Sequence, residues 1–189
     1  DMDFETDKDI EDEMTQLMDH MLVPMLEGTG EVPRTGLMFP DRENISDEMK
    51  VQMAADPDAK AMFIVPNMGM DKEVFYRLLA DIARENKVRN TMFFSDSWIS
   101  EQDQTKVESG DMVMPSQDPN RLDALMLHYV NTDVNGILLK TAMMAQIYEH
   151  KDGKVVLKKR RFHVSNNDVN SGTHVHGAIA DALSYNNWA

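Results

Sequence analysis

The stretch from residue 90 to 165 constrains the fold of this 189-residue chain more than any other, because it predicts four β-strands in succession. Tight-turn signals at Asn135-Gly136 and Lys151-Asp152-Gly153 separate the last three of these strands. The pattern predicts an antiparallel meander, in which we expect Ile137, Leu139 and Ile147 to be buried on the apolar side. The four expected strands are 91–99, Leu122–Asn131, Gly136–Tyr148 and Lys154–Val164.

Helical patterns lie on both sides of this meander in the sequence. Residues 6–27 carry an apolar stripe at three- and four-residue spacing, and Thr6 with Asp9 forms a capping pattern at their start. Pro24 should kink or restart this helix, because proline removes a backbone donor. A strand at 61–65, an amphipathic helix from Asp71 and the strand at 91–99 together resemble a β-α-β unit.

This order of elements predicts one α+β domain over residues 1–189, with a mostly antiparallel sheet of about five strands and helices packed mainly on one face. The helical N-terminal part is expected at about 6–56 and the sheet-containing part at about 60–165. A closing helix is expected at about 175–186. Residues 28–45 and 100–121 are rich in glycine, proline and polar residues, and they are expected to be loops.

Charge and cysteine content exclude several classes of protein. The formal net charge is −14, and phosphate backbones and anionic membranes repel so acidic a chain, so nucleic acid is an unfavoured partner and no membrane contact is expected. The absence of cysteine excludes disulfides, thiolate zinc sites and cysteine nucleophiles. Without a long apolar run or a leader-like start, we expect a soluble cytoplasmic protein, and its general character suggests a bacterial or phage source.

A histidine pair at His174 and His176 is the closest approach to a metal motif. Two histidines at this spacing on a strand point the same way and can share a metal ion, with Asp168 and Asp181 as further ligands. The pair is similar to the His-x-His of JAMM-type metalloproteases, which implies a metal-dependent hydrolase. That family continues with Ser-x-x-Asp, whereas this chain has Asn187 at the aspartate position. The alternative interpretation is a pair of surface or capping histidines.

A basic run at Lys158, Lys159, Arg160 and Arg161 precedes Phe162 on the last predicted strand. A patch of this kind could hold an anion or nucleic acid. A strand, however, divides the four charges between its two faces. The alternatives are an edge strand protected against unwanted pairing by its charges, and ion pairs with the acidic first helix.

Asp96 lies between aromatic residues on the strand at 91–99 and is expected to share one face with Phe94 and Trp98. A buried carboxylate there would have a raised pKa and could act as a general acid or base, with His128 on the next strand as its partner. Asp96 and His128 are therefore the candidate catalytic residues. No Gly-x-Ser-x-Gly elbow accompanies them, and a strand aspartate more often binds a neighbouring loop.

No phosphate loop or dinucleotide fingerprint occurs in the sequence, so no cofactor is expected and an enzyme is the less favoured interpretation. The preferred hypothesis is a non-catalytic binding or assembly module that acts through protein–protein contacts, including self-association. It rests on the long loops and on a methionine-rich first helix in a chain with 17 methionines. The alternatives are a metal-dependent hydrolase using His174 and His176, and an anion or nucleic-acid binder using Lys158–Arg161.

Overall fold

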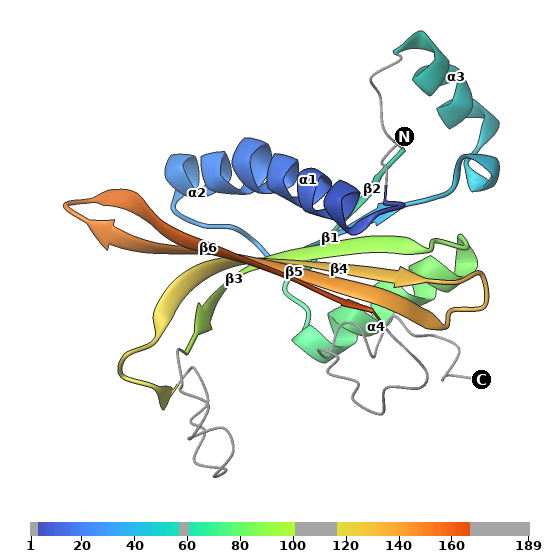
Figure 1. Cartoon of the computed structure of the whole chain (residues 1–189). Helices are drawn as coiled ribbons and strands as arrows, with labels where there is room; N and C mark the ends of the chain where they lie inside the picture. The colour runs from blue at the N-terminus through green and yellow to red at the C-terminus, as the bar shows by residue number, and fades with distance from the viewer. Residues whose placement is uncertain (1–3, 57–60, 101–116, 167–189) are drawn as a thin grey trace.

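The computed structural model describes residues 4–56, 61–100 and 117–166, which build one six-stranded sheet flanked by helices (Figure 1). Every neighbouring pair of strands is antiparallel. The predicted α+β class with an antiparallel sheet is confirmed, with six strands in place of about five. In spatial order the strands are β2 (Phe63–Pro66), β1 (Thr35–Phe39), β3 (Asn90–Ile99), β4 (Leu122–Thr132), β5 (Leu138–Lys151) and β6 (Lys154–Asn166).

Strands β3 to β6 form the predicted meander, and the backbone has positive φ at both predicted turns, including Gly136 and Gly153. The register of β4 on β5 shifts next to the first turn, where Leu138 pairs with Thr132 but Lys140 pairs with Asn131. This irregularity buries Leu138 and leaves Ile137 and Leu139 with 44% and 45% of their surface exposed. The expected burial of those two residues was therefore wrong, whereas Ile147 is buried as expected.

The additional strand is β1, which lies inside the segment predicted to be a loop. All five of its residues are buried, so the segment lacks the alternation of polar and apolar residues that marks a half-exposed strand. β1 pairs with β2 on one side and with β3 on the other. The predicted β-α-β unit therefore has its two strands parallel but separated by β1, so they are not neighbours.

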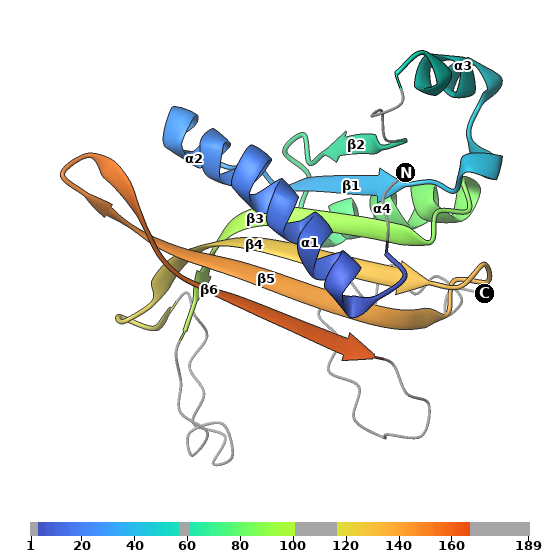
Figure 2. The same cartoon turned by 45° about the horizontal axis from the view of Figure 1, so that its top comes forward.

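The N-terminal helix runs obliquely across one face of the sheet (Figure 2). It consists of α1 (Asp7–Leu17), a π-helical turn η1 (Met18–Leu22) and α2 (Val23–Thr29). The predicted capping box is present, since the Asp9 N–H donates to Thr6 Oγ1 and the Thr6 N–H donates to Asp9 Oδ2. Pro24 lies in the first turn of α2, directly after the π-helical turn, so the helix restarts there as predicted.

The π-helical turn follows from the spacing of the buried residues. They recur every four positions, whereas an α-helix turns once in 3.6 residues, so a four-residue stripe drifts around an α-helix. The wider π turn holds more residues per turn and brings the stripe back to the sheet. The fully buried members are Ile10, Met14, Met18, Leu22 and Leu26. Since the methionines of this helix lie in or against the core, they are core filling and do not form an exposed docking surface.

The opposite face of the sheet is covered at the β1–β3–β4 end by α4 (Lys72–Glu85). Its residues Phe75 and Leu79 pack with Met38 of β1 and Phe93 of β3. The neighbours of Met38 and Phe93 along each strand point the other way, toward the N-terminal helix. A 3-10 turn η2 (Arg42–Asn44) and α3 (Asp47–Ala55) form an arm between β1 and β2 that projects beyond the sheet (Figure 1). In the part of the chain that the structure describes, no helix is long and apolar enough to cross a membrane. The closing helix predicted at about 175–186 lies outside the described residues.

The close approach of β1 to α4 gives a test of this packing. A Cβ added at Gly36 would lie 2.5 Å from Cδ2 of Leu79, which is fully buried. We expect Gly36→Ala to lower the free energy of unfolding by about 1–3 kcal/mol through overpacking. The matched control is Gly28→Ala in α2, where a Cβ meets nothing within 4 Å, and it should be neutral or stabilising by up to about 1 kcal/mol. Urea unfolding measures both, and equal effects of the two substitutions would contradict the packing.

Candidate functional site

The structure places the two candidate catalytic residues on opposite faces of the sheet. Asp96 lies two residues after Phe94 on β3 and so shares its face, and Phe94 belongs to the cluster under the N-terminal helix. His128 instead pairs in register with Phe93, and their rings lie 6.1 Å apart on the α4 side. The sheet therefore separates the Asp96 carboxylate from the His128 imidazole, and the acid–base pair expected from the sequence is not formed.

His128 is largely enclosed between the sheet and the start of α4. Burial, with a smaller contribution from the charge of Lys72, lowers its pKa from 6.5 to about 4. The imidazole is therefore neutral at pH 7, and it packs as a ring against Phe93.

Asp96 belongs instead to an aromatic and acidic surface beside the C-terminal end of α2. We call it the Trp98 surface, and it follows from the register of three strands. Trp98 pairs with Asp123 on β4, and Asp123 pairs with Tyr148 on β5, so these side chains form a row across the sheet. The Trp98 surface comprises Asp96, Trp98, Arg121, Asp123, Tyr148 and His150.

Three contacts hold this surface together. The Tyr148 hydroxyl donates a 2.7 Å hydrogen bond to Oδ1 of Asp96, and the Tyr148 ring meets His150 edge to face at 5.5 Å. The guanidinium carbon of Arg121 lies 4.2 Å from the centroid of the Trp98 ring, which is 48% exposed. A half-exposed tryptophan that already carries a guanidinium shows which kind of group this surface accepts.

Negative charge accumulates around the same place. Partial desolvation against the sheet raises the pKa of Asp96, and the nearby charges of Asp123 and Glu31 raise it further, whereas the hydrogen bond from Tyr148 lowers it. The pKa of Tyr148 is raised, first by burial and then by its bond to Asp96. Carboxylates that repel one another beside an exposed indole ring favour a cation, because a bound positive charge relieves that repulsion.

The basic run on β6 does not form one continuous patch. Arg160 lies on the side of the N-terminal helix, where Nη2 contacts Asp19 at 2.5 Å and Nε donates to Oε1 of Gln146 at 2.7 Å. Arg161 pairs in register with Ala145 and so faces the other way. Lys158 forms an exposed ion pair with Glu149. The strand divides these charges between its two faces, as expected for a strand. The ion pair of Arg160 with Asp19 and the position of β6 at the edge of the sheet agree with the two alternatives drawn from the sequence, which were pairing with the acidic first helix and a charge-protected edge strand.

The structure does not describe the candidate metal ligands. His174, His176, Asp168 and Asp181 all lie outside the described residues, so a metal site there stays a prediction. Among residues 4–56, 61–100 and 117–166, no group of three or more His, Asp or Glu side chains could hold a metal ion.

Comparisons with protein-family models, with curated proteins and with solved structures give no match. What the Trp98 surface can bind therefore follows from its own chemistry. Sequence reasoning found Asp96 and Trp98 on one face but missed Asp123, Tyr148 and His150. The signal for them was the register of β3 on β4 and of β4 on β5, which aligns Asp123 and Tyr148 with Trp98.

The depressed pKa of His128 makes a prediction about pH. Between pH 6.5 and about 4, His128 binds a proton in the unfolded chain but not in the folded state, so the free energy of unfolding falls as the pH drops through this range. We expect His128→Leu to abolish this component. Compared with the variant, the unmodified protein should lose up to about 1.4 kcal/mol per pH unit in urea unfolding. If the two proteins instead lose stability equally over this pH range, His128 binds its proton in the folded state as readily as in the unfolded chain, and the prediction is wrong.

The contacts of Arg160 predict unequal effects of two substitutions. Arg160→Met leaves Oε1 of Gln146, which is 3% exposed, without its donor and should cost about 1–3 kcal/mol of unfolding free energy. Asp19→Asn removes only the exposed ion pair and should cost less than about 1 kcal/mol. Thermal or urea unfolding measures both values, and an effect of Asp19→Asn equal to that of Arg160→Met would contradict the role assigned to Gln146.

Proposed function

We propose that this protein is a non-catalytic binding module that holds an arginine- or lysine-containing segment of a partner protein on the Trp98 surface. The observation that carries the proposal is the guanidinium of Arg121, which lies over the exposed ring of Trp98 in the same row as Asp123. A partner's arginine or lysine would meet the same indole face and the same carboxylates. Its approach is favoured by the net charge of −14, because opposite charges steer association.

The surface also has the composition expected of a protein interface. Aromatic residues contribute much of the binding energy of protein interfaces when the contacts around them exclude water. Trp98 provides the exposed aromatic area, and Asp96 and Asp123 provide acceptors for a partner's N–H groups. Tyr148 is only 4% exposed, so it supports the surface from within by holding Asp96 in place. In the same row, Leu157 of β6 is 41% exposed and extends the apolar part of the surface.

Binding through protein contacts was also the preferred interpretation of the sequence, but the residues that support it are now those of the Trp98 surface. The methionines of the first helix lie in or against the core, so they no longer argue for it. Self-association stays a prediction, as does a cytoplasmic location. A second copy of the chain would be one source of the basic segment, and light scattering over a range of protein concentrations distinguishes that source from a different partner.

The test uses a synthetic glycine-serine peptide with two arginines and an analogue in which citrulline replaces both arginines. Citrulline keeps the shape of the side chain and removes its charge. We expect the arginine peptide to bind more tightly than the analogue and to weaken as salt is added. Trp98→Leu and Asp123→Asn should each reduce its affinity by about five-fold or more, in line with a cation–π contact or a charge-assisted hydrogen bond.

Asp81→Asn is the matched control, because it removes an exposed carboxylate from α4 on the opposite face, and it should leave the affinity unchanged. Arg121→Gln removes the guanidinium that already occupies the indole face, so it should strengthen peptide binding. Equal affinity for the arginine and citrulline peptides would refute the proposal, as would unchanged binding by both Trp98→Leu and Asp123→Asn.

A further inference from the structure

A second site lies at the base of the projecting arm, away from the Trp98 surface. A cavity of about 740 Å³ opens between the arm and the adjoining ends of β1 and β3. Its volume falls within the range of about 300–1,000 Å³ typical of small-molecule sites. The lining is contributed by the segment after β1, by η2, by α3 and by the residue before β3, and consists of Asp41, Arg42, Glu43, Ile45, Lys50, Met53, Ala54 and Arg89.

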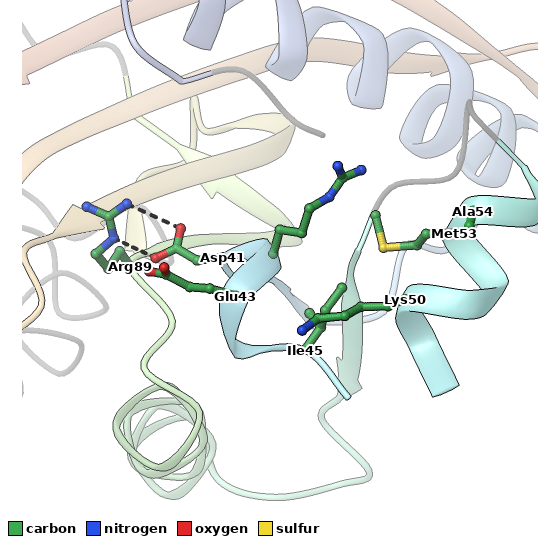
Figure 3. A pocket seen from close by; sticks show the side chains of 8 residues that line it. Asp41, Glu43, Ile45, Lys50, Met53, Ala54 and Arg89 are labelled. Atoms are coloured by element: carbon green, nitrogen blue, oxygen red, sulfur yellow. Dashed lines mark hydrogen bonds and ion pairs between the residues drawn. The ribbon is translucent and has the colours of Figure 1, made fainter. Parts of the chain in front are cut away.

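The two sides of this cavity differ in chemistry (Figure 3). On the side of the sheet, Arg89 donates from Nε and Nη2 to the two carboxylate oxygens of Asp41, at 2.9 and 3.2 Å. On the side of the arm, Ile45 and Met53 belong to a small buried cluster and present apolar surface. The cavity therefore combines a rigid polar wall, fixed by a two-pronged ion pair, with an apolar wall.

The charges of the lining favour an anion, although the chain as a whole is strongly acidic. Three cationic side chains line the cavity against two carboxylates, and Arg89 already neutralises Asp41. The ammonium group of Lys50 forms no ion pair with any residue in the described part of the chain. It projects from α3 beside Ile45, so a positive charge stands next to apolar surface (Figure 3).

We propose that this cavity binds a small molecule with an apolar body and one carboxylate, whose carboxylate is held by Lys50 while its apolar part lies against Ile45 and Met53. Arg42 lines the same cavity. Asp41 and Arg42 also line a neighbouring cavity of about 140 Å³. This site does not depend on the Trp98 surface.

Three probes of one shape test the ligand class: 2-naphthoate, the neutral 2-naphthamide and the cationic 2-naphthylmethylammonium ion. Met53 supplies the readout, because its labelled methyl group reports binding by NMR and can be assigned from Met53→Leu. We expect 2-naphthoate to shift this methyl signal saturably and to bind about ten-fold more tightly than 2-naphthamide, as a charge-assisted contact allows. The cationic probe should bind most weakly.

Lys50→Gln should reduce the affinity for 2-naphthoate to that for 2-naphthamide. Its matched control is Lys151→Gln, an exposed lysine at the β5–β6 hairpin far from the arm, which should leave the affinity unchanged (Figure 1). The other methionine methyl signals confirm that each variant is folded. The proposal is overturned if no probe shifts the Met53 signal at millimolar concentration, if the ammonium probe binds most tightly, or if Lys50→Gln binds 2-naphthoate like the unmodified protein.

Discussion

Burial of the apolar stripe of the N-terminal helix against the β3–β4–β5 face is the contact on which the rest of the structure depends. The helix covers Phe94, Leu125 and Leu127, and each large apolar side chain buried in this way contributes about 1.5–3 kcal/mol. Ion pairs hold the helix at two places along its length, from Lys140 to Asp7 and from Arg160 to Asp19. The Trp98 surface lies on the same face of the sheet, where Trp98 is 48% exposed and Asp96 is exposed beside it.

The meander could be predicted from the sequence because its signals are local. A hairpin needs only two alternating runs and a turn that tolerates positive φ, as at Gly136 and Gly153. β1 could not be found in this way, since its pairing with β2 and β3 is remote in sequence and burial on both faces removes the alternation. The irregularity at Leu138 is likewise invisible in the sequence, yet it decides which of two adjacent leucines is buried.

In the candidate site, too, the sequence predicted what depends on neighbouring residues and missed what depends on strand pairing. The period of two in a strand places Asp96 and Trp98 on one face without any knowledge of the partners. Choosing His128 as a partner required the register, and β3 pairs Phe93 with His128. Asp96 is three residues from Phe93, an odd number, so its side chain points to the opposite face from His128. The true neighbour, Tyr148, lies two strands away and was reachable only through the pairing of β4 with β5.

The π-helical turn at Met18–Leu22 has a consequence for how the length of the chain can vary. Such a turn is in effect an α-helix with one residue too many, and the surplus is absorbed locally as a bulge. Loss of a single residue from this turn would convert it to ordinary α-helix and leave the flanking segments in nearly their present orientation. The middle of the longest helix is therefore a place where the polypeptide can shorten by one position without rotating Leu26 and its neighbours away from the sheet.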